Sequence, residues 1–124
     1  MIYLMDVSAL VALLWTEHAS HEAARMWAVG KKFALCPITE IGFLRVSSKG
    51  LQATLEQSRA VLSGFLKTEN PVFIPANIRY FDGEPSPSPK KTTDWYLANL
   101  AKAHGMKWAT FDKGANHPNA ELIA

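Results

Sequence analysis

Four acidic side chains stand where a short apolar run ends or a helical pattern begins, and they are Asp6, Glu40, Asp94 and Asp112. Asp6 and Asp112 each follow a run typical of a strand that is buried on both faces. Glu40 and Asp94 each stand at the start of a segment with helical spacing of apolar residues. In a parallel sheet, strand ends and the starts of the following helices meet at one edge, where ligands bind. We therefore expect the four carboxylates to converge at this edge.

Close carboxylates define the chemistry expected at such an edge. Four of them repel one another and cannot all stay ionised without a cation. Oxygen ligands with incomplete protein coordination suit Mg²⁺ or Mn²⁺, which keep water ligands and bind substrate phosphate. Such ions activate water and stabilise the leaving oxygen of a phosphodiester, so the pattern predicts a nuclease-like site. Taken singly, each acid also has a structural explanation, as a partner of the helix dipole or as a turn residue at a strand end.

Composition places the chain among ordinary globular proteins. At 124 residues, with 48% apolar and 19% charged residues, it is predicted to be one domain, 1–124, with one core. Its apolar runs are shorter than the roughly 20 residues of a membrane span. No basic region precedes the first apolar run, so we expect no signal peptide, no membrane span and a cytoplasmic location. The single cysteine, Cys36, argues against an internal disulfide, and a net charge of +2 does not by itself indicate a nucleic-acid binder.

Alternating patterns predict an α/β fold with a central, mostly parallel sheet of four to five short strands flanked by helices. The strands are expected over 2–5, 33–36, 71–75, 107–111 and, at an edge, 121–123. The helices are expected over about 9–14, 21–29, 40–50, 55–67 and 95–104. Thr39 and the segment 92–94 are expected to cap helices, and Thr54 with Gln57 matches a capping box. The Pro- and Ser-rich stretch 82–91 is expected to be an exposed loop.

Four motifs around the acids carry a resemblance to a known family. The motifs are Met5–Leu10, Pro37–Arg45, Thr93–Leu97 and Ala109–Gly114. In this order and spacing they resemble the PIN domain. More closely, they resemble its VapC-type toxin ribonucleases of type II toxin–antitoxin systems. Residues 50–91 carry little of the likeness. The resemblance implies a PIN-like three-layer sandwich.

The same resemblance implies an activity and partners. It implies a metal-dependent endoribonuclease that uses Mg²⁺, with Mn²⁺ as the alternative, and cuts structured RNA such as tRNA or rRNA. It further implies a homodimer that a cognate antitoxin holds inactive. The four acids match the family's metal-site positions, and Ser8 and Thr110 match hydroxyls that support the site. Asn116 stands where some members carry a further acid, so we assign one metal ion and leave a second open.

The residues themselves favour hydrolysis by water over covalent catalysis. Ser8 lacks a Gly-x-Ser-x-Gly setting and Cys36 lacks an identifiable base, so neither is predicted to be a nucleophile. Attack by water in place of the RNA 2′-hydroxyl predicts a 5′-phosphate and a 3′-hydroxyl. Arg45, about one turn beyond Glu40, is a candidate contact for RNA phosphate, and an ordinary solvated arginine fits the pattern equally well.

Three other functions compete with the toxin hypothesis. A housekeeping PIN ribonuclease in RNA processing would have the same site without an antitoxin. A catalytically silent PIN module would bind RNA or protein, although intact acids at all four positions argue against it. A phosphorylated receiver domain would need paired acids after its first strand, where this chain has Met5 and Asp6.

Overall fold

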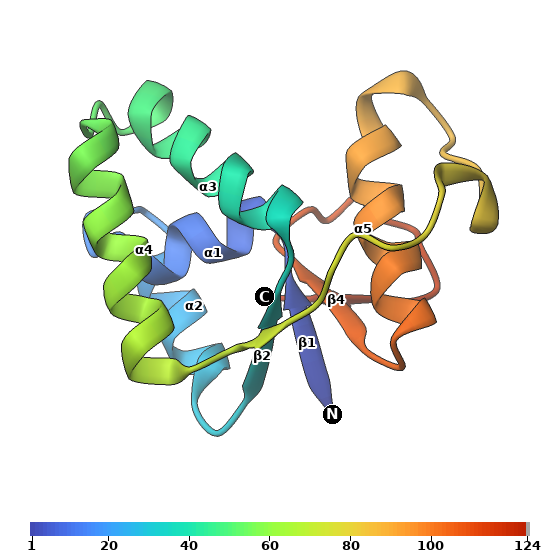
Figure 1. The fold of residues 1–124 in the computed structure, drawn as a ribbon, viewed down its shortest axis with the longest axis horizontal. Coiled ribbons are helices and arrows are strands. Elements are labelled where there is room, and N and C mark those ends of the chain that lie inside the picture. Colours follow the sequence, from blue (N-terminus) through green and yellow to red (C-terminus); the bar gives the residue numbers. More distant parts are fainter. Residues whose placement is uncertain (124) are drawn as a thin grey trace.

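The computed structural model describes residues 1–123, and within them one sheet holds five strands in the order β3-β2-β1-β4-β5 (Figure 1). Every neighbouring pair of strands is parallel. The strands are β1 (Ile2–Met5), β2 (Lys32–Leu35), β3 (Val72–Phe73), β4 (Lys107–Thr110) and β5 (Ala120–Leu122). β1 therefore occupies the centre of the sheet, and the residue that follows it lies at the middle of the carboxyl edge.

Helices cover both faces of the sheet, which gives the predicted three-layer α/β sandwich. Four helices lie on one side and α5 lies on the other, packed against β4 and β1 (Figure 1). The helices are α1 (Val7–Leu14), α2 (His21–Ala28), α3 (Pro37–Gly50), α4 (Leu55–Glu69) and α5 (Thr92–Ala103). The predicted fold class is thus confirmed for the described part of the chain.

Two apolar cores, one on each face, explain why the strands lack polar alternation. Met5 faces the core that contains Leu10 and Phe43, whereas the preceding residue, Leu4, faces the core that contains Trp108. All five of these side chains are fully buried. Because successive strand residues point to opposite faces, a strand with both faces covered must be apolar throughout.

Helix starts differ from the prediction at three places that matter for the acids. α1 begins at Val7, with Asp6 as its N-cap, whereas the helix was expected to begin at about residue 9. α3 begins at Pro37, two residues before the expected cap Thr39, since proline suits the first helical position. α5 begins at Thr92, so Asp94 lies inside its first turn and is not a cap. The Thr54 capping box at the start of α4 is confirmed.

The stretch 82–91 is a largely exposed segment without a long helix or strand, as its composition predicts. Short 3₁₀ turns, Tyr80–Asp82 and Pro89–Lys91, stand at its two ends. Asn99 of α5 donates a hydrogen bond to the Glu84 carbonyl, 2.9 Å away, which ties the segment to the helix. Among the described residues no helix is both long and apolar enough to cross a membrane.

Candidate active site

Asp6 lies at the carboxyl end of the central strand and is fixed there by three hydrogen-bond donors. Its carboxylate accepts from the Val7 amide at 2.8 Å, the Ser8 hydroxyl at 3.0 Å and the Thr110 hydroxyl at 2.8 Å. The parallel register pairs Met5 with Ala109, which sets Asp6 beside Thr110 at the next position. Burial raises the pKa of Asp6, the three donors oppose this rise, and the charge of Asp112 adds to it. Asp6 is thus a buried, oriented carboxyl group.

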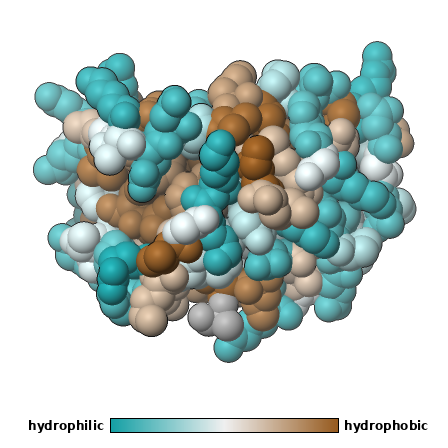
Figure 2. All heavy atoms as spheres, turned by 90° about the horizontal axis from the view of Figure 1, so that it is seen from below, coloured by the Kyte–Doolittle hydropathy of each residue, from teal (hydrophilic) through white to brown (hydrophobic). Residues whose placement is uncertain are grey.

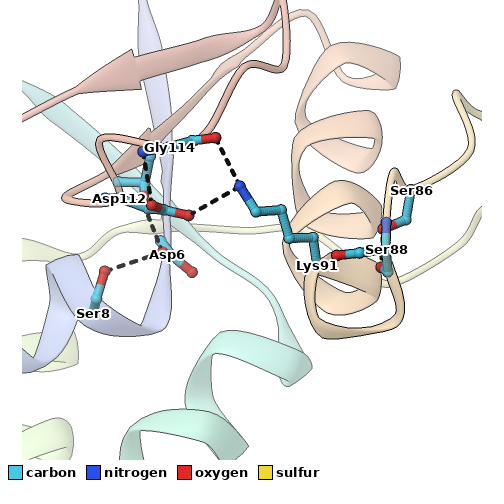
Figure 3. A network of polar contacts seen from close by, with 8 residues as sticks. Asp6, Ser8, Ser86, Ser88, Lys91, Asp112 and Gly114 are labelled. Atoms are coloured by element: carbon cyan, nitrogen blue, oxygen red, sulfur yellow. Dashed lines mark hydrogen bonds and ion pairs between the residues drawn. The ribbon is translucent and has the colours of Figure 1, made fainter.

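Asp112 is held beside Asp6 by the same threonine. The Thr110 hydroxyl that donates to Asp6 accepts a hydrogen bond from the Asp112 amide at 3.0 Å. The Asp112 carboxylate in turn accepts from the Gly114 amide at 2.9 Å, which closes a tight turn after β4 (Figure 3). One buried side chain therefore links the positions of two acids that are far apart in the sequence.

Asp94 reaches the same edge from the opposite layer, on the first turn of α5. Burial, followed by the charges of Asp6 and Asp112, raises the pKa of Asp94 to about 6, while the Lys91 charge acts in the opposite direction. The two aspartates act on Asp94 because strand ends and a helix start meet at the carboxyl edge. The structure therefore brings three of the four predicted acids within electrostatic reach of one another.

Glu40, in the first turn of α3, lies near the same carboxyl edge of the sheet but apart from the three aspartates. The neighbouring Thr39 hydroxyl, fully buried, donates to the Met5 carbonyl at 2.9 Å and ties the first turn of α3 to the end of β1. A Cβ at Gly42 would overlap the Val7 side chain, so glycine permits this close approach of α3 to α1. Burial raises the pKa of Glu40, and no acid contributes to the shift. Glu40 is therefore placed near the edge without coupling to the aspartates.

The last two predicted site residues, Arg45 and Asn116, make no contribution to the cluster of aspartates. Arg45 is exposed on α3, and Asn116 is exposed in the loop after β4. Neither side chain forms a hydrogen bond or ion pair with the residues that the structure describes. Both remain predictions of the sequence.

The donor set fits a hard divalent cation in its chemistry. Three carboxylates of like charge meet at this edge, and burial, followed by the charges of the neighbouring aspartates, raises the pKa of Asp94 and of Asp6. Within residues 1–123, no three Asp, Glu, His or Cys side chains lie close enough together to hold a metal ion as they stand. The carboxylates repel one another as they stand, and a cation bound between them would offset this repulsion.

One hollow in the surface lies away from the acids. It has a volume of about 570 Å³ and is lined by residues of α1, α2, β2 and α4, including Ala28, Phe33 and Phe65. Apolar side chains also gather on the face seen from below, which is turned away from the acidic edge (Figure 2). Met26 and Val29, 65% and 72% exposed, extend this apolar surface. The lining is mainly apolar, although it also includes Arg25, Lys31 and Glu69, and it contains none of the four acids.

Sequence reasoning missed the contacts by which three residues shape the site. Thr39 fixes α3 against β1, and Gly42 allows α3 to approach α1 closely. For Gly42, a glycine inside a helical pattern was the available signal. Lys91 reaches from the start of α5 to the turn after β4, donating to the Gly114 carbonyl at 2.7 Å (Figure 3). Its position one turn before Asp94 gave no hint of this long-range contact.

With this geometry established, the chain can be compared with known proteins. Residues 3–120 match the PIN domain family, and the chain therefore belongs to that family. Among its relatives, ribonuclease VapC38 of Mycobacterium tuberculosis is 33% identical over 120 residues, which cover 90% of this chain and 85% of the relative. Ribonuclease VapC44 of the same species is 35% identical over 121 residues, covering 89% and 85%. A solved toxin–antitoxin complex from Klebsiella pneumoniae shares the fold, with a TM-score of 0.66 over 98% of each chain at 16% identity.

Proposed function

We propose that this chain, as a single PIN domain over 1–124, is the ribonuclease toxin of a toxin–antitoxin pair and hydrolyses phosphodiester bonds of cytoplasmic tRNA or rRNA. One observation carries the proposal: Asp94, at a helix start, meets the ends of the two strands that lead to Asp6 and Asp112, and burial together with the charges of these two aspartates raises the pKa of Asp94 to about 6. Buried carboxylates that repel one another, offset here only in part by Lys91, destabilise a fold and are typical of sites built for a cation.

The side chains of the proposed site have different roles, as metal ligands or as groups that orient a ligand. Asp6, Asp94 and Asp112 are the proposed metal ligands, with Glu40 completing the set from α3. Mg²⁺, or Mn²⁺, bound there would lower the pKa of an attacking water and offset negative charge developing on the phosphate. Ser8 and Thr110 orient the Asp6 carboxylate toward this position through their hydroxyl groups.

The protonation of Asp94 sets a lower pH limit on the activity. Below about pH 6, the Asp94 carboxyl group of the metal-free protein holds a proton and is a poor ligand. Arg45, exposed on α3, is proposed to contact RNA phosphate, and Asn116, exposed beyond Asp112, is proposed to support the site. Asn116 has no charge to offer a second metal ion, so one ion is proposed.

The relatives support the substrate and the partner. VapC38 and VapC44 are named ribonucleases, and the Klebsiella structure is a toxin–antitoxin complex. The apolar groove between α2 and α4, about 570 Å³ in volume, supports a protein partner that binds away from the acids. A homodimer is proposed from the family resemblance, and the exposed Ile41 and Phe73, 57% and 59% exposed, are candidates for its interface.

The experiment is cleavage of end-labelled total tRNA and rRNA by antitoxin-free protein with Mg²⁺ or Mn²⁺. We expect cuts at discrete positions that leave 5′-phosphate and 3′-hydroxyl ends. EDTA should abolish the cuts and added Mn²⁺ should restore them. Cutting that persists in EDTA, or products with 2′,3′-cyclic phosphate, would contradict the proposal. An absence of cutting by folded protein across the whole RNA pool would favour a silent binding module.

A further inference from the structure

Lys91 is the basic side chain that reaches into the acidic edge. Its Nζ donates to the Gly114 carbonyl at 2.7 Å and lies 4.0 Å from the Asp112 carboxylate (Figure 3). Its ammonium group also lies over the Trp95 ring, 5.6 Å from the ring centroid. Among residues 1–123, this is the one ion pair that involves any of the four candidate acids. Lys91 thus connects the layer of α5 to the end of β4.

The turn that receives Lys91 is shaped around its ammonium group. A Cβ at Gly114 would lie 3.3 Å from the Lys91 Nζ and 3.4 Å from the Asp112 Oδ1. The missing side chain therefore leaves room for the cation and the carboxylate over the same backbone. The side chains of Lys91 and Asp112 are 30% and 40% exposed, so a solvated metal ion can approach the same oxygens.

The charge of Lys91 acts on more than its direct partner. It opposes the effect of Asp6 and Asp112 on the pKa of Asp94. Lys90, the residue directly before Lys91, is exposed and forms no ion pair with the described residues. Of these two adjacent lysines, Lys91 therefore contacts an acid of the edge, and Lys90 contacts none among the described residues.

We propose that Lys91 is the resident counter-cation of the acidic edge, a positioning residue that holds the Asp112 turn against α5 and competes with the metal ion for this carboxylate. The inference rests on the proposed function, because the competing ion is the one assigned there. Without metal, the lysine neutralises part of the charge and stabilises the fold. A metal ion held by Asp112 would displace the ammonium group from this carboxylate, and the positive charge of Lys91 would oppose the ion.

This competition predicts opposite effects on stability and on metal affinity. In Lys91→Met, the unfolding equilibrium constant in EDTA should rise about threefold, as expected for a partly exposed ion pair with a charge-assisted hydrogen bond. Mn²⁺ should bind Lys91→Met with a Kd about three- to tenfold lower than the parent, because one positive charge within a Debye length is gone. A purely structural role of the lysine would instead weaken Mn²⁺ binding, since the Asp112 turn would loosen.

The test is calorimetric titration with Mn²⁺ and urea unfolding in EDTA, both at low ionic strength and without RNA. The variants are Lys91→Met, the charge-preserving Lys91→Arg and the neighbouring control Lys90→Met. We expect Lys91→Arg to keep the parental Kd within about twofold, and Lys90→Met to change neither quantity by more than that. The change in Kd should shrink in 0.5 M KCl because salt screens the charge.

The outcomes separate this inference from the proposed function. Weaker or unchanged Mn²⁺ binding by Lys91→Met, with tight binding by the parent, would overturn the competition and leave the ribonuclease proposal intact. Equal changes in Lys90→Met would show a general charge effect and would also overturn it. If the parent binds no Mn²⁺, the proposed metal site and the competition fail together, and the unfolding data in EDTA then decide the counter-cation role alone.

Discussion

Replacing Asp94 by asparagine removes the carboxyl group on which the charges of the acidic edge act most clearly. Its pKa is raised from 3.8 to about 6 by burial and by the charges of Asp6 and Asp112. Between these two values the native protein holds a proton that the unfolded chain has released. The free energy of unfolding therefore falls as the pH rises from about 4 to about 6, and the loss is complete above that range.

The size of the effect follows from the pKa difference. About 2 pKa units correspond to at most about 3 kcal/mol, and solvent screening of this partly exposed group reduces the expected value to about 1–2 kcal/mol. Asp94→Asn keeps the size and polarity of the side chain and removes the titration. The metal-free variant should therefore be about 1–2 kcal/mol more stable than the parent at pH 8 and equal to it near pH 4.

The assay is urea unfolding in EDTA from pH 4 to pH 8, followed by tryptophan fluorescence. Asp82→Asn is the matched control, because it removes one negative charge from the exposed 3₁₀ turn away from the edge. With saturating Mn²⁺ the order should reverse, since the parent keeps a ligand that the variant lacks. A variant that is less stable than the parent at pH 8 in EDTA, or equally stable at every pH, would refute the reasoning.

The remaining predictions concern the groups that hold the site in place. Thr110→Val should lower the free energy of unfolding by about 1–3 kcal/mol and raise the pKa of Asp6 further, as measured by ¹³C NMR titration; an unchanged pKa would contradict the hydrogen bond. Thr39→Val should cost about 1–2 kcal/mol and speed hydrogen exchange in the first turn of α3, because the bond to the Met5 carbonyl is lost; unchanged exchange would count against that anchor. Phe43→Ala should lower the free energy of unfolding by about 3–5 kcal/mol, as measured by urea unfolding. The Phe43 side chain of α3 is fully buried against α1. A loss below about 1 kcal/mol would show that the core collapses around the gap.

The fold followed from the sequence because its elements obey local rules. Ile2–Met5 is apolar at every position since both faces of β1 are covered, and the capping box at Thr54 depends on residues three apart. Helix starts were harder to predict. The Asp6 side chain caps α1 itself, and the hydroxyl of Thr39, which was expected to cap a helix, donates to the Met5 carbonyl at the end of β1.

The candidate site was predictable only in part. Parallel topology places strand ends and helix starts at one edge, so the convergence of Asp6, Asp94 and Asp112 follows from their positions in sequence. The link through Thr110 depends on the register between β1 and β4, and Lys91 meets Gly114 across 23 positions of sequence. Such long-range contacts are set by tertiary packing, which local patterns do not encode.

The most direct measurement compares two variants that each lose one aspartate in the same RNA cleavage assay with Mg²⁺ or Mn²⁺. The chain has four aspartates, of which Asp6 lies at the centre of the acidic edge and Asp82 lies on the exposed 3₁₀ turn. Asp6→Asn should abolish cleavage at every discrete position while the protein stays folded, and Asp82→Asn should cut the same positions at the parental rate. Cleavage that survives Asp6→Asn would contradict the assignment of the acidic edge as the active site of this PIN domain.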